Sequence, residues 1–103
     1  MPMKVNLQSV NFNIDQSLSE FVNLKLDNLD RYYDNIIEAF VYLKVQNTSE
    51  KENKIAEFKL LIPGGELIVK KQCKTFEEGI DLALVSLKRQ LQRKKEKQRA
   101  HQL

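Results

Sequence analysis

The chain reads Ile55-Ala-Glu-Phe-Lys-Leu-Leu-Ile62, then Pro63-Gly64-Gly65, then Glu66-Leu-Ile-Val-Lys-Lys-Gln-Cys-Lys74. Apolar residues alternate with polar ones on both sides of the tripeptide, which is the pattern of strands with one buried face. Proline fixes φ and the glycines can adopt φ > 0, so the tripeptide predicts a tight turn. The stretch therefore predicts a β-hairpin whose core-facing residues are Ala56, Phe58, Leu60, Ile62, Leu67, Val69 and Cys73.

Two more strands are predicted before this hairpin. Residues 36–46 alternate, with one side made of Ala39, Val41, Leu43 and Val45. Residues 3–10 alternate in the same way over a shorter length. The wholly polar segment 47–53 predicts the loop that leads into the hairpin. The other face of the sheet is expected to face water and to carry the side chains of Tyr42, Lys44, Lys59 and Lys70.

Two helices are predicted where the apolar period changes to three and four residues. Ser17-Leu-Ser-Glu20 and Thr75-Phe-Glu-Glu78 each match a capping box. The first begins a helix over residues 17–34, with a core face of Leu18, Val22, Leu26, Leu29 and Tyr33. The second begins a longer helix, with a core face of Phe76, Ile80, Ala83, Leu84, Leu87 and Leu91. Because Lys94 and Lys95 continue this face beyond Leu91, we expect residues from about 92 to 103 to project from the core.

The order β-α-β-β-β-α predicts an α+β fold in a single domain, residues 1–103. A strand, a helix and a strand favour parallel pairing of the first two strands, and two hairpin steps then extend the sheet in antiparallel fashion. Both helices need an apolar surface, so we expect them side by side on one face of a four-stranded mixed sheet. This arrangement is similar to that of double-stranded-RNA-binding domains.

Composition and chemistry favour a binding protein over an enzyme. The 103 residues are 42% hydrophobic and 30% charged, with one cysteine, which excludes an internal disulfide and a thiolate-rich metal site. No apolar run approaches the roughly 20 residues of a membrane span, and no signal-peptide pattern is present, so we expect a cytoplasmic protein without membrane contact. His101 lies near the C-terminus, Cys73 lies on the core side of a strand, and the series Asp27, Asp30 and Asp34 is typical of a solvated helix face. We therefore expect no catalytic residue, metal, cofactor or small-molecule substrate.

The positive charge of the chain is concentrated in residues 88–101. Seven bases stand there against one acid, giving +6, whereas ten bases and thirteen acids give −3 elsewhere. The helix macrodipole favours a few cations near a C-terminus but does not account for seven. A dense cationic row suits a polyphosphate, because each neutralised phosphate releases counterions. Nucleic acid is the predicted partner, and Tyr32 remains open as a surface on which a base could stack.

The sequence also resembles the ribosome hibernation promoting factor / ribosome-associated inhibitor family, in its short form. The residues that carry the likeness follow one order and spacing over nearly the whole chain: Leu18-x-x-Phe-Val-x-x-Lys25-Leu-x-x-Leu29-x-x-Tyr-Tyr33, Val41-Tyr-Leu-Lys-Val45, Gly64-Gly-Glu66, Ile80-Asp81, and Leu87-Lys-Arg-Gln-Leu91 followed by Arg93, Lys95 and Lys97. The family fold is β-α-β-β-β-α with both helices on one sheet face.

The resemblance implies binding to the small ribosomal subunit and its ribosomal RNA, in the groove through which messenger and the A- and P-site transfer RNAs pass. Translation would then be repressed by occupancy. The family contacts imply phosphate contacts at Lys25, Arg89, Arg93, Lys95 and Lys97, and charge alone adds Lys88, Lys94 and Arg99. Since the chain ends at Leu103 without the dimerisation domain of long-form members, ribosome dimerisation would need a separate partner, and we expect a monomer away from the ribosome.

Two alternatives remain. A generic double-stranded-RNA-binding module would be displaced from small subunits by any RNA duplex. An adaptor whose basic helix docks in an acidic protein groove would form a complex that survives ribonuclease.

Overall fold

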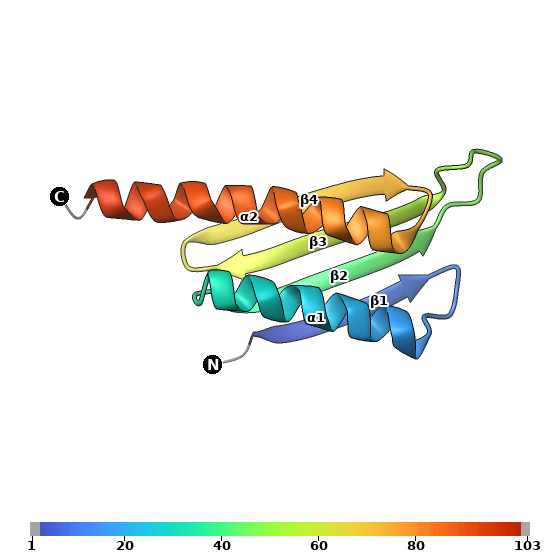
Figure 1. Cartoon of the computed structure of the whole chain (residues 1–103), viewed down its shortest axis with the longest axis horizontal. Helices are drawn as coiled ribbons and strands as arrows, with labels where there is room; N and C mark the ends of the chain where they lie inside the picture. Colours follow the sequence, from blue (N-terminus) through green and yellow to red (C-terminus); the bar gives the residue numbers. More distant parts are fainter. Residues whose placement is uncertain (1–2, 102–103) are drawn as a thin grey trace.

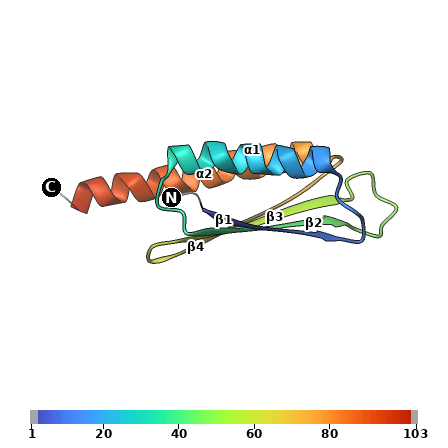
Figure 2. The same ribbon diagram turned by 90° about the horizontal axis from the view of Figure 1, so that it is seen from below.

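A computed structural model describes the backbone of residues 3–101 and the side chains of residues 3–97. Its elements follow the predicted order: β1 (Lys4–Val10), α1 (Gln16–Tyr32), β2 (Glu38–Val45), β3 (Lys54–Ile62), β4 (Gly65–Cys73) and α2 (Phe76–His101). Figure 1 shows the two helices running side by side across the sheet, and Figure 2 shows that both lie on the same face of it. The predicted α+β architecture is confirmed.

The four strands form one mixed sheet in the order β1-β2-β3-β4. β1 pairs with β2 in parallel, and the β2–β3 and β3–β4 pairs are antiparallel. The hairpin of β3 and β4 turns at Gly64, whose φ of 85° is a value that side-chain-bearing residues rarely adopt. The predicted tight turn is therefore confirmed, with β4 beginning one residue earlier than expected.

The core lies between the sheet and the two helices. Val41, Phe58 and Val69 are in register across β2, β3 and β4, and all three are buried. They pack below the helix face predicted from the sequence, since Leu18, Val22, Leu26 and Leu29 of α1 are all buried. Tyr33 is also buried, but it is extended and follows the helix, which ends two residues earlier than predicted. Each large side chain that is fully buried stabilises the fold by about 1.5–3 kcal/mol. The other sheet face carries Tyr42 and Lys70, as predicted, because both are in register with Glu57.

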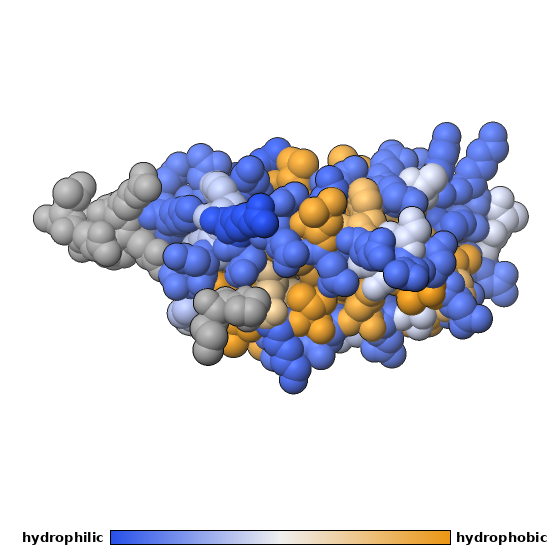
Figure 3. All heavy atoms as spheres, turned by 60° about the horizontal axis from the view of Figure 1, so that its bottom comes forward, coloured by the Kyte–Doolittle hydropathy of each residue, from blue (hydrophilic) through white to orange (hydrophobic). Residues whose placement is uncertain are grey.

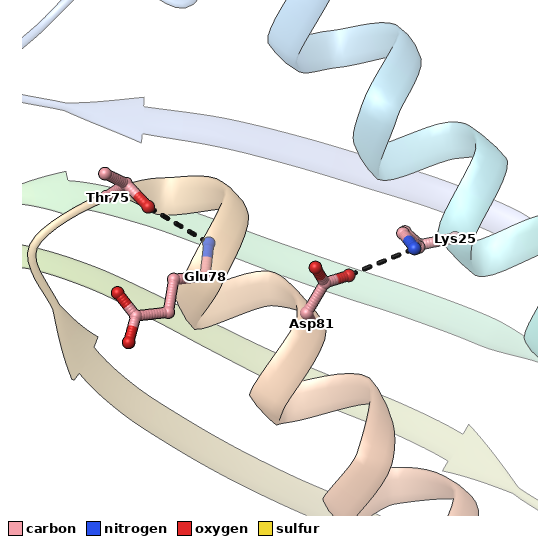
Figure 4. Close-up of polar contacts among 4 residues, drawn as sticks. All are labelled: Lys25, Thr75, Glu78 and Asp81. Atoms are coloured by element: carbon pink, nitrogen blue, oxygen red, sulfur yellow. Dashed lines mark hydrogen bonds and ion pairs between the residues drawn. The ribbon is translucent and has the colours of Figure 1, made fainter.

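The two helices begin in different ways, and one predicted cap is wrong. α1 begins at Gln16 and its N-cap is Asp15, whose carboxylate accepts a 2.7 Å hydrogen bond from the backbone N–H of Leu18. Ser17, the predicted cap, already lies inside the helix. An aspartate two residues earlier satisfies the same free N–H groups, because aspartate, asparagine and serine cap about equally well. α2 begins as predicted: the Thr75 hydroxyl accepts from the backbone N–H of Glu78 at 3.1 Å (Figure 4).

Candidate nucleic-acid interface

The cationic end of α2 begins where its contact with the core ends. Leu91 is fully buried, and Arg93, Lys94 and Lys97 that follow it are exposed. At 1.5 Å per residue, the helix of 26 residues is about 39 Å long, whereas a strand of 9 residues spans about 30 Å. Figure 1 shows the C-terminal part of α2 extending past the end of the sheet. The side chain of Arg99 lies outside the described residues.

The predicted phosphate-contacting residues divide into two groups. Four of them, Arg89, Arg93, Lys94 and Lys97, are exposed. We call these four the free face of α2. Within residues 3–97, their side chains form no hydrogen bond or ion pair. The others that the structure describes, Lys25, Lys88 and Lys95, each contact another group of the protein.

Lys95 and Lys88 both contact the end of α1. The Lys95 ammonium donates a 2.6 Å hydrogen bond to the backbone carbonyl of Tyr32 and lies 4.3 Å from the centre of its ring. The Lys88 ammonium lies 4.7 Å from the same ring centre. The sequence predicts both lysines as phosphate contacts; their proximity to Tyr32 depends on the packing of two helices that are far apart in the chain.

Lys25 forms an ion pair across the two helices. Its ammonium lies 3.0 Å from the carboxylate of Asp81 on α2, as Figure 4 shows. It also lies 5.2 Å from the centre of the Phe21 ring. The side chains of Lys25 and Asp81 are 31% and 54% exposed, so the pair is accessible to a ligand phosphate that competes for the lysine.

Two shallow grooves flank α2, each of about 320 Å³. The first groove lies between the two helices and is lined by Lys25, Asn28, Leu29, Tyr32, Asp81, Leu84, Val85 and Lys88. The second lies between α2 and the start of β4 and is lined by Leu67, Gln90, Arg93, Lys94 and Lys97. Among the described residues that line the second groove, the charged ones are all cations, whereas the first groove contains the Asp81 carboxylate. The sequence pattern did not indicate the contribution of Leu67 and Gln90, because a groove forms only when strand and helix are packed.

Exposed hydrophobic residues lie among hydrophilic ones on one side of the molecule. Figure 3 brings the side of α1 and β1 forward and shows hydrophobic residues near the middle, with hydrophilic ones toward the end from which α2 extends. Exposed Leu24 and half-buried Phe21, Val5 and Leu7 belong to these two elements.

Other chemistry is limited in the part of the chain that the structure describes. Cys73 is a free, buried thiol; burial raises its pKa, and the carboxylates of Glu78 and Glu52 raise it further. Residues 3–97 contain no cluster of three or more histidine, cysteine or carboxylate side chains able to hold a metal ion. No described helix is both long and apolar enough to cross a bilayer.

Comparison with known proteins gives the family. The family model described as Sigma 54 modulation protein / S30EA ribosomal protein matches residues 5–99. The chain belongs to this family. The ribosome hibernation promoting factor of Salmonella typhimurium is 33% identical over 99 residues, which is 96% of this chain and 100% of that protein. The ribosome hibernation promoting factor of Pseudomonas putida is 32% identical over 98 residues, covering 95% of this chain and 92% of that one. The family resemblance inferred from the residues is confirmed.

Two solved structures agree with the fold. The N-terminal domain of Thermus thermophilus Protein Y superimposes with a TM-score of 0.73 at 30% identity, over 90% of this chain and 98% of that one. A ribosomal subunit interface protein from Coxiella burnetii superimposes with a TM-score of 0.80 over the same shares of the two chains. Its sequence identity is 20%, so this second likeness concerns the fold alone.

Proposed function

We propose that this protein is a ribosome hibernation factor, which binds the small ribosomal subunit through ribosomal RNA and represses translation. In this proposal, α2 enters the channel that messenger and the A- and P-site transfer RNAs occupy. The protein works by occupancy as a cytoplasmic monomer, without catalysis and without a cofactor. The names of the relatives support a hibernation role, and the distribution of charge supports RNA as the partner.

The observation that carries the proposal is the free face of α2. Arg89, Arg93 and Lys97 follow one another at intervals of four residues, so they form one row along the helix. Lys94 lies with Arg93 and Lys97 in the groove beside β4. A row of exposed cations on an element that leaves the globular body can enter a crevice in folded RNA and neutralise several phosphates. The binding energy then comes mainly from counterion release, with little reading of base sequence.

The intramolecular contacts assign unequal roles to the predicted residues. The free face of α2 makes the principal phosphate contacts. Lys25 contributes in competition with Asp81, and Lys88 and Lys95 contribute while they remain against Tyr32. We propose Arg99 as a further contact on the basis of its charge.

Co-sedimentation with purified ribosomal subunits tests the proposal. The chain should pellet with small subunits and not with large subunits at low salt, and its binding should weaken steeply as salt rises. A variant in which Arg89, Arg93 and Lys97 are replaced by glutamine should remain in the supernatant. A matched variant with Lys44, Lys51 and Lys70 replaced by glutamine carries the same change of charge away from the helices and should pellet normally. Equal loss from both variants would show that only total charge matters.

Competition with duplex RNA separates the proposal from a generic double-stranded-RNA-binding module. An excess of unrelated duplex should leave the protein on small subunits, because a duplex lacks the crevice that α2 enters. Release by the duplex would favour the generic module. Gradient profiles of whole ribosomes in the same mixtures would measure dimerisation, which the proposal permits and does not require.

A further inference from the structure

The last turn of α1 and the outgoing part of α2 meet at Tyr32. We use outgoing part for the residues of α2 that follow Leu91. Tyr32 is half-buried, and the next residue, Tyr33, is buried in the core. The carbonyl of Tyr32 belongs to the last turn of α1, where backbone oxygens have no partner within the helix. Lys95 supplies that partner at 2.6 Å. A charged donor at this position is also favoured by the partial negative charge of a helix C-terminus.

The two lysines approach the same ring from one row of α2. Lys88 and Lys95 are seven residues apart, which is close to two full turns, so they lie on the same side of the helix. Their ammonium groups lie 4.7 and 4.3 Å from the centre of the Tyr32 ring, within the range of cation–π attraction. Leu91 lies between them in sequence and is the last buried residue described on α2. The Lys88 contact therefore lies before the point at which α2 leaves the core, and the Lys95 contact lies after it.

The part of α2 after Leu91 needs tertiary contacts to stay helical, because repulsion between its own charges destabilises the helix. The free face places like charges at successive intervals of four residues, which destabilises an isolated helix. A short helical extension without tertiary contacts is marginal in water. Among residues 92–97, Lys95 is half-buried and the others are exposed.

We propose that Tyr32, with Lys88 and Lys95, forms a clamp that fixes the direction and helicity of α2 beyond Leu91. Tyr32 is a positioning residue: it holds the free face in the orientation needed to enter the RNA crevice. This inference rests on the proposed function, since it assigns an orienting contact to the same interface.

The test uses variants that keep every charge. Tyr32→Leu removes the ring that attracts both ammonium groups, whereas Tyr32→Phe keeps the ring; both variants keep the backbone carbonyl that accepts from Lys95. Tyr42→Leu is the matched control, because Tyr42 is also half-buried but lies on the opposite face of the sheet. Two quantities are measured: backbone order of residues 92–97 by ¹⁵N relaxation in the free protein, and affinity for small subunits over a range of salt concentrations.

The clamp predicts a specific combination of results. Tyr32→Leu should lower the order of residues 92–97 and weaken binding about tenfold, roughly the effect of two exposed cation–π contacts, with an unchanged slope of log K against log salt. Tyr32→Phe and Tyr42→Leu should behave like the parent chain. Weaker binding by Tyr32→Leu with unchanged order at residues 92–97 would mean that Tyr32 stacks on RNA directly, and it would overturn the clamp. Unchanged order and unchanged affinity would overturn it as well.

Failure of the proposed function gives a different result. If the parent chain ignores small subunits in dilute buffer, the proposed function is wrong. The relaxation data then decide the structural part of the clamp without reference to the ribosome.

Discussion

Replacing Asp81 by asparagine should destabilise the protein slightly and strengthen its binding to RNA. Asp81 pairs with Lys25 at 3.0 Å across the two helices (Figure 4). Asparagine keeps the shape and an acceptor oxygen but loses the charge, so Lys25 becomes available to a phosphate. The same change removes a negative charge from the groove between the helices.

The magnitudes follow from the exposure of the pair. With side chains 31% and 54% exposed, the ion pair belongs to the partly screened class that contributes about 0.2–1 kcal/mol. For a domain of this size, that loss lowers Tm by about 1–6 °C. One additional phosphate contact increases the magnitude of the salt slope by about 0.7–0.9, which at about 0.1 M salt corresponds to fivefold to eightfold tighter binding.

The assay measures thermal unfolding and small-subunit affinity of Asp81→Asn beside Glu50→Gln. Glu50 is an exposed carboxylate in the loop between β2 and β3, and it belongs to neither helix, so its replacement alters net charge equally without freeing Lys25. Only Asp81→Asn should bind more tightly. Equal gains from both variants, or lower stability with no gain in affinity, would refute a role for Lys25 at the interface.

Three further changes probe the free face, the core and the thiol. Arg93→Ala should reduce the magnitude of the salt slope by about one while Tm stays within about 2 °C; an unchanged slope would exclude direct phosphate contact. Leu91→Ala removes a fully buried side chain where α2 leaves the core and should cost about 2–5 kcal/mol in denaturant unfolding, with a smaller loss implying that the site collapses around the alanine. Because burial raises the pKa of Cys73, the folded state keeps its proton at a pH where the unfolded chain has lost it, so stability is lost as pH rises above the usual value of 9.0. The stability of the parent relative to Cys73→Ala should therefore fall as pH rises above 9.0, and a constant difference would contradict the assigned burial.

Most of the fold could be predicted because its signals are local. Alternation around Pro63-Gly64-Gly65 predicted the hairpin, and the apolar spacing from Leu18 to Leu29 predicted the buried face of α1. Such patterns report directly which side chains a strand or helix buries. The α1 cap failed because two candidates, Asp15 and Ser17, stand within one turn, and spacing alone does not decide between them.

The sequence predicted the positive charge of the candidate site but not the contacts between its residues. The row of bases after Leu91 is visible in the sequence. The pairing of Lys25 with Asp81, and of Lys88 and Lys95 with Tyr32, joins residues more than 50 positions apart and depends on how the two helices pack. Those contacts separate the free face from the cations that also serve the structure.

Competition with transfer RNA on isolated small subunits tests the proposed occupancy most directly. Labelled protein bound to small subunits should be released by messenger together with transfer RNA bound in the P site, and prebound protein should block their binding in return. Simultaneous binding of the protein and P-site transfer RNA to one subunit, at saturating concentrations of both, would contradict insertion of α2 into the decoding channel.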